Sequence, residues 1–139
     1  MPRVRGQQVM NGDGPQYLPR MSLAGTPLPF SGGVRIGDIL YLSGQMGFRE
    51  DGTLAEGMQA QTRQALDNVG KVLASAGLGF SDVFHCTVML ADTSLWAAFN
   101  QIYLEYFKEP LPTRSAFGVA ALALGGLVEL ECQAYAGTR

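Results

Sequence analysis

The chain of 139 residues has the length of one domain, and 16% of its residues are charged, against roughly 25% in an average soluble domain. A formal charge of −2, without any tract of basic residues, argues against a dominant role in binding nucleic acid. The shortage of charge predicts that part of the surface meets other subunits, because charged residues are depleted at the cores of interfaces.

Histidine and cysteine are scarce in this chain. His85 is the one histidine, and the two cysteines, Cys86 and Cys132, are far apart and form no CxxC pair. A zinc site of His and Cys ligands is therefore not expected, and we expect no metal and no cofactor. The sequence has no run of about 18 apolar residues and no apolar signal-peptide core, so we expect no membrane partner and a cytoplasmic location with reduced thiols.

The first part of the chain divides into an arm and the start of a domain. Residues 1–28 mix Gly, Pro, Gln and Asn with little periodicity and predict an irregular arm, in which 21–24 is a candidate short strand. Residues 29–139 are expected to form a single domain. Residues 34–36 and 39–42 are rich in β-branched and large apolar residues and flank Gly37-Asp38, which predicts a hairpin.

The middle of the chain alternates helix and strand patterns. Apolar or small residues recur every three or four positions from 58 to 76, which predicts a helix that ends at Gly77. Residues 83–90 predict a strand with alternating faces. Its expected core face is Phe84, Cys86, Val88 and Leu90, and its opposite face is Val83, His85, Thr87 and Met89.

A second helix is expected to begin near Thr93 or Ser94, to carry an aromatic stripe from Trp96 to Phe107, and to end before Pro110. Strands are predicted over 114–119 and 127–135. This order predicts an α+β fold in which two helices cover one face of a mixed β-sheet. In the last strand Glu129 and Glu131 alternate with apolar residues and fall on the face away from the helices.

Arg114, Glu129 and Asn100 are the polar residues best placed to carry chemistry. Arg114 follows the rigid turn at Pro112, and its planar guanidinium matches a carboxylate, although spacing alone favours a surface or interface ion pair. Paired carboxylates at 129 and 131 suit acid and base work, but solvated residues on an exposed sheet face are the commoner outcome. Asn100 lies inside the aromatic stripe and needs a hydrogen-bond partner.

Several segments together resemble the RidA family, also called YjgF/YER057c/UK114, of reactive enamine/imine deaminases. They are PFSGGVRIGDILYLSGQ at 29–45, AQTRQALDNVGKVLASAG at 60–77, EYF at 105–107, LPTRSA at 111–116 and VELECQA at 128–134. The resemblance implies a chorismate-mutase-like fold. It also implies a homotrimer whose sheets pack around a central axis, with clefts between subunits and no cofactor.

The resemblance assigns roles to individual residues. Arg114 is expected to lie on or near the same sheet face as Glu129 and to bind the carboxylate of a 2-imino or 2-enamino acid, and Glu129 to order the attacking water. Gly44 and Asn100 match positions near the cleft. Hydrolysis would then release a 2-keto acid and ammonia.

Three positions near the expected cleft depart from the common family pattern. Phe30 stands where active members commonly have Tyr, Gly32 where many have Gln, and Ala116 where the best-known deaminases have Cys. Phe30 and Ala116, the latter through its backbone amide, remain candidate substrate contacts. The departures keep a second hypothesis open, a small-acid binding or regulatory module without turnover. An endoribonuclease or translation inhibitor is a third, for which one histidine and an acidic chain give little support.

Overall fold

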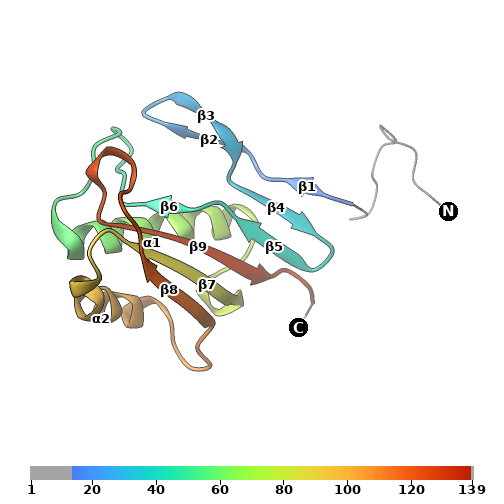
Figure 1. Ribbon diagram of the computed structural model, residues 1–139. Coiled ribbons are helices and arrows are strands. Elements are labelled where there is room, and N and C mark those ends of the chain that lie inside the picture. Colours follow the sequence, from blue (N-terminus) through green and yellow to red (C-terminus); the bar gives the residue numbers. More distant parts are fainter. Residues whose placement is uncertain (1–13, 139) are drawn as a thin grey trace.

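The computed structural model describes residues 14–138 (Figure 1). Its elements in chain order are β1 (Gln16–Tyr17), β2 (Arg20–Leu23), β3 (Thr26–Ser31), β4 (Gly33–Ile36), β5 (Ile39–Leu42), β6 (Gln45–Met46), α1 (Gly57–Ser75), β7 (Val83–Leu90), α2 (Trp96–Tyr106), β8 (Thr113–Gly118) and β9 (Val128–Tyr135). Short 3-10 turns span Phe80–Asp82, Thr93–Leu95 and Ala123–Gly125. The described part of the chain thus has the order of elements that the sequence predicts.

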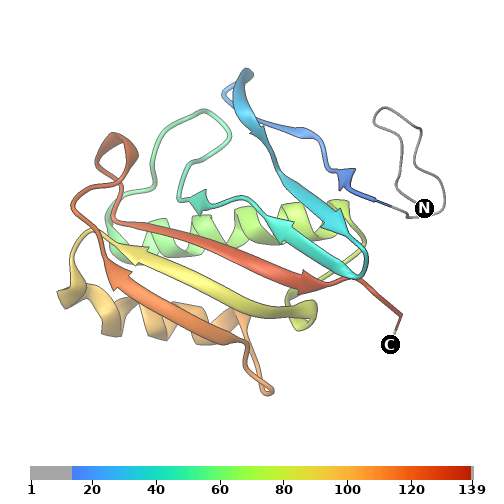
Figure 2. The same cartoon turned by 45° about the vertical axis from the view of Figure 1, so that its right-hand side comes forward.

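Seven strands of the described chain form one sheet in the order β1-β4-β5-β9-β7-β8, with β6 continuing β5 along β9. Strands β7 and β8 are parallel and the other pairs are antiparallel. Strands β2 and β3 form a separate hairpin. Both helices pack on the same face of the sheet (Figures 1 and 2), so the predicted α+β architecture is confirmed.

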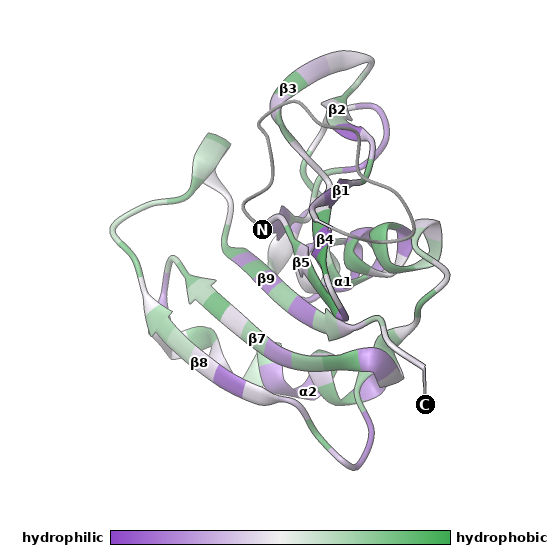
Figure 3. Cartoon of the chain, turned by 90° about the vertical axis from the view of Figure 1, so that its right-hand side faces the viewer, coloured by the Kyte–Doolittle hydropathy of each residue, from purple (hydrophilic) through white to green (hydrophobic). Residues whose placement is uncertain are grey.

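Alternation along β9 determines which face is buried. Val128, Leu130, Cys132 and Ala134 are at most 2% exposed and pack toward the helices. Glu129 is half-buried and Glu131 is exposed on the other face. Figure 3 shows the resulting bands of hydrophilic and hydrophobic residues along β9. We call the face without helices the open face.

One prediction about β7 is wrong. Val83 is 6% exposed and belongs to the core, whereas Phe84 is 39% exposed, the reverse of the expected faces. The pairing of β7 with β9 shifts register between Val83 and His85. An irregularity of this kind inserts a residue and inverts the alternation before it. From Cys86 to Leu90 the predicted faces are confirmed.

The arm and the second helix also differ from expectation in detail. Residues 1–13 of the expected arm lie outside the described residues. Beyond them the chain is more regular than predicted: β1 pairs with β4, and β2 nearly coincides with the candidate strand at 21–24. The 3-10 turn that leads into α2 is capped by Asp92 rather than by Thr93 or Ser94, because the Asp92 carboxylate accepts the backbone N–H of Ser94 at 2.9 Å, and α2 itself has no side-chain cap. No helix in residues 14–138 is long and apolar enough to cross a membrane.

Candidate active site

Five of the six predicted site residues divide between two cavities, and the sixth, Ala116, lines neither. Arg114 and Asn100 line a cavity of about 270 Å³ beside α2, which we call the arginine pocket. Phe30, Gly44 and Glu129 line a cavity of about 710 Å³ beneath the β2–β3 hairpin, which we call the glutamate chamber.

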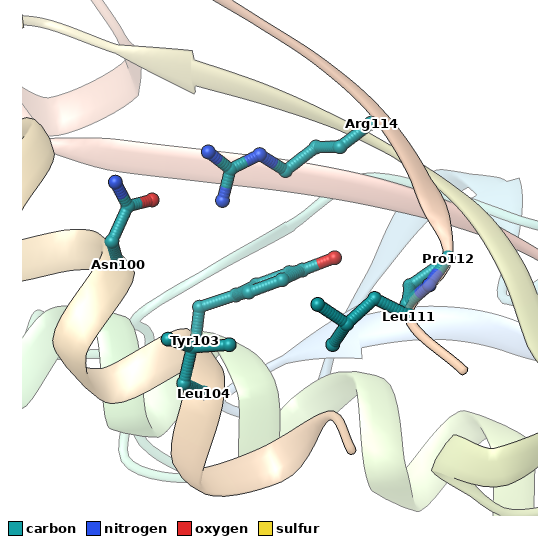
Figure 4. A pocket seen from close by; sticks show the side chains of 6 residues that line it. All are labelled: Asn100, Tyr103, Leu104, Leu111, Pro112 and Arg114. Atoms are coloured by element: carbon teal, nitrogen blue, oxygen red, sulfur yellow. The ribbon is translucent and has the colours of Figure 1, made fainter. Parts of the chain in front are cut away.

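Arg114 forms one wall of the arginine pocket (Figure 4). Its Cζ atom lies 4.9 Å from the centroid of the Tyr103 ring and 5.7 Å from that of Phe99, so the guanidinium stacks over aromatic faces. No carboxylate within residues 14–138 forms an ion pair with it. The surface ion pair that spacing alone favoured is therefore absent from this part of the chain, and the guanidinium is open to an anionic ligand.

Buried polar atoms without partners mark both cavities. Within residues 14–138 they are Asn100 Oδ1, Tyr103 Oη and Gln45 Nε2. The first two residues line the arginine pocket and the third lines the glutamate chamber. Since buried polar groups are nearly always hydrogen-bonded, their gathering at cavities indicates that each cavity holds a ligand or water.

Tyr103 and Gln45 were not among the predicted site residues. Tyr103 belongs to the aromatic stripe of α2, and burial raises the pKa of its hydroxyl, which stays a neutral donor. Gln45 ends the Ser43-Gly44-Gln45 segment and is 5% exposed. A polar group within an apolar pattern was the available signal for both, as it was for Asn100.

Glu129 and Gly44 touch in the glutamate chamber. A Cβ built on Gly44 would lie 2.6 Å from Glu129 Oε2 and 3.2 Å from its Cδ, so a larger residue would collide with the carboxylate. Partial burial, and then the charge of Glu131, raise the pKa of the Glu129 carboxyl. A raised pKa makes this carboxylate a better proton acceptor than an exposed one.

Arg114 and Glu129 lie on opposite faces of the sheet. Arg114 pairs with Cys86 across β8 and β7, and Cys86 pairs with Cys132 across β7 and β9. Paired residues share a face, and Cys132 faces the helices. Glu129 is an odd number of residues from Cys132 and faces the other way. The expectation that Arg114 lies on or near the open face is therefore wrong, and one chain does not bring the two residues together.

The remaining candidates have ordinary structural roles or flank the cavities. Ala116 shares the face of Arg114, two residues further along β8, and lines neither cavity. His85 lies on the open face, where its Nδ1 is 2.8 Å from Thr113 Oγ1. That hydroxyl donates to the Phe84 carbonyl at 3.1 Å, so it accepts from His85. As predicted, His85 is a sheet residue outside the candidate site.

The two cysteines are buried free thiols that face each other across β7 and β9, and Cys86 lies on the core face as predicted. Within the described residues, no group of three or more His, Cys, Asp or Glu side chains could hold a metal ion.

The described chain is an α+β protein with two helices on one face of a mixed sheet, an arginine without an ion-pair partner in residues 14–138, and a partly buried carboxylate. A family model described as Endoribonuclease L-PSP matches residues 24–136. The chain belongs to this family, which is the YjgF/RidA family that its motifs resemble.

Characterised relatives carry deaminase names. The chain is 40% identical over 111 residues to the 2-iminobutanoate/2-iminopropanoate deaminase of Capra hircus, which covers 78% of this chain and 81% of that protein. It is 39% identical over 106 residues to the chloroplastic Reactive Intermediate Deaminase A of Arabidopsis thaliana, over 75% of this chain and 57% of that protein.

Solved structures share the fold. RidA from the Antarctic bacterium Psychrobacter sp. PAMC 21119 superposes with a TM-score of 0.80 at 35% identity, covering 86% of this chain and 98% of that one. E. coli TdcF with bound serine superposes with a TM-score of 0.79 at 29% identity, covering 88% of this chain and 99% of the TdcF chain.

Proposed function

We propose that this protein hydrolyses reactive 2-imino and 2-enamino acids to 2-keto acids and ammonia, at a site that two copies of the chain complete together. The observation that carries the proposal is that the two candidate catalytic side chains are separated within one chain. The open guanidinium of Arg114 and the partly buried carboxylate of Glu129 lie on opposite faces of one sheet. Each is one half of a site for an acid with an electrophilic carbon.

In the proposed reaction, the fork of Arg114 binds the substrate carboxylate and places the imine carbon. Asn100 Oδ1, buried without a partner, accepts a hydrogen bond from the imine N–H. Glu129 takes a proton from water as the water oxygen bonds to the imine carbon. Glu129 passes this proton to the nitrogen, and the second proton of the water follows by the same route. The C–N bond then breaks, and ammonia leaves as the C=O bond forms. Acid–base help of this kind contributes about 10² to 10⁴ in rate.

The assembly that would join the half-sites is a homotrimer packed through the open faces. This face carries large apolar side chains that one chain leaves exposed, including Tyr41 at 46% and Phe117 at 47%. Their burial against a neighbouring copy would account for the low charged fraction of the sequence. Because β8 is an edge strand of the sheet, Arg114 at the edge of one copy would then reach Glu129 on the open face of the next, and neither a metal nor an organic cofactor takes part.

Small-acid binding without turnover is the second candidate, supported by the serine-bound relative and by the departures at Phe30, Gly32 and Ala116. It would use the same arginine pocket. A thermal shift with 2-keto acids that depends on Arg114, together with no imine turnover, would favour binding alone. Cleavage of single-stranded RNA by the purified protein would instead support the activity in the family description.

The test generates 2-iminopropionate or 2-iminobutyrate in situ with an amino-acid oxidase and follows its loss with and without the protein. Wild type should accelerate the loss, and Arg114→Ala should reduce the acceleration at least about 100-fold, because the acid is no longer positioned. Arg35→Ala is the matched control, since Arg35 lines neither cavity and its side chain donates to the Gly37 carbonyl and pairs with Asp38. Equal acceleration by wild type and Arg114→Ala would overturn the proposal.

A further inference from the structure

The glutamate chamber is larger than a small imino acid requires. Its volume of about 710 Å³ falls among cavities of roughly 300–1,000 Å³ that hold drug-sized ligands. The imino acids in the names of the relatives carry only a methyl or an ethyl side chain. Most of the chamber would therefore remain empty or wet around such a substrate.

Apolar side chains line the chamber away from Glu129. They come from the β2–β3 hairpin, the segment after β6, helix α1 and the turn before β9, and include Met21, Leu23, Leu28, Phe48, Val72 and Leu124. The hairpin and the segment between β6 and α1 rise together on the side of the sheet where β6 lies (Figure 2). The polar end, where Gly44 contacts the Glu129 carboxylate, thus opens into an apolar space.

The basic residues of the chamber already have partners. Lys71 pairs with Glu50 at 3.5 Å, Arg49 donates to Thr53 and to a backbone carbonyl, and Arg20 Nε donates to the carbonyl of Leu28. These contacts do not favour a substrate with a second acidic group. The unpartnered amide nitrogen of Gln45, a residue 5% exposed, marks the chamber as a ligand site rather than a packing defect.

We propose that the chamber is the subsite for the substrate side chain, and that the preferred substrates are 2-imino acids with bulky apolar side chains, branched aliphatic or aromatic. This rests on the proposed function. With the reacting carbon beside Glu129, a side chain of four or more carbons would lie against the apolar lining. Each methylene that becomes buried contributes about fourfold to kcat/KM. Leucine-derived and phenylalanine-derived imines should therefore exceed the alanine-derived imine by at least about tenfold.

A pair of variants in one turn tests the subsite. Ala123 lines the chamber, whereas Ala121, two residues earlier and also exposed, does not. Ala123→Phe should fill the space and lower the leucine-to-alanine ratio of kcat/KM at least about fivefold, leaving the alanine-derived imine nearly unaffected. Ala121→Phe should leave the ratio unchanged. Thermal unfolding of both variants checks that they fold.

The measurement compares imines generated by one oxidase from alanine, 2-aminobutyrate, leucine and phenylalanine. A preference for the alanine-derived imine, or an equal loss on all four substrates in Ala123→Phe, would overturn the subsite while leaving the proposed function in place. Acceleration of none of the four imines by wild type would overturn the proposed function itself, and the subsite with it.

Discussion

Replacing Gly44 by alanine should impair catalysis without unfolding the protein. The new Cβ would lie 2.6 Å from Glu129 Oε2, well inside a normal contact distance of about 3.5 Å, so the carboxylate must move by roughly 0.5–1 Å. A displacement of about 1 Å can cost about 10²-fold in rate. We therefore expect kcat for imine hydrolysis to fall between about 10-fold and 100-fold.

Stability should change little in this variant. The obstructing atoms are at the end of a flexible side chain, and the alanine restricts the unfolded chain, which offsets part of the strain. The free energy of unfolding in urea should therefore stay within about 1 kcal/mol of wild type. Gly79→Ala is the matched control, because its new Cβ would meet no atom within 4 Å and the φ of −139° at this position suits any residue. Wild-type kcat in Gly44→Ala would refute the role assigned to the Glu129 carboxylate.

Three further outcomes are expected. Because the pKa of Glu129 is raised and its ionised form accepts the proton, the rate should fall as pH drops through that pKa, and Glu129→Gln should lose this acidic limb of the pH–rate profile. A raised pKa in the folded protein means that protonation favours the folded state, so Glu129→Gln should not lose stability at neutral pH. An unchanged pH–rate profile in the variant would contradict this. Gln45→Met should lower the free energy of unfolding in urea by about 1 kcal/mol, since it removes an amide donor that water in the chamber satisfies; a gain would mean that the amide is unsatisfied. Val83→Ala should lower the free energy of unfolding by about 1–2 kcal/mol more than Phe84→Ala, because Val83 is buried and Phe84 is exposed. A larger loss in Phe84→Ala would mean that Phe84 faces the core, as strict alternation predicted.

The elements with strict periodicity were predictable from the sequence. The 3.6-residue repeat of α1, the hairpin at Gly37-Asp38 and the alternation of β9 are confirmed, because each pattern reports local geometry directly. Phe84 was assigned to the wrong face because a register shift depends on how β7 meets β9, which no local pattern encodes.

The candidate site was predictable as residues but not as an arrangement. The face of Arg114 follows from the parallel register of β8 on β7, a pairing between segments that α2 separates in the chain. Gln45 and Tyr103 were missed because an unpartnered buried polar atom is recognised only once the surrounding atoms are placed. The sequence resemblance supplied Arg114, Glu129 and Gly44; the fold then separated them into two halves.

The shared site is tested most directly by mixing two variants that each retain only a small part of the wild-type activity. Arg114→Ala and Glu129→Gln would be unfolded together, refolded as an equal mixture and assayed for imine hydrolysis. If Arg114 of one copy works with Glu129 of its neighbour, three quarters of randomly assembled trimers are mixed and each has one intact site of three, so about one quarter of wild-type activity should return. If both residues act within one copy, no mixed trimer contains an intact site, and the mixture would stay as inactive as the separate variants.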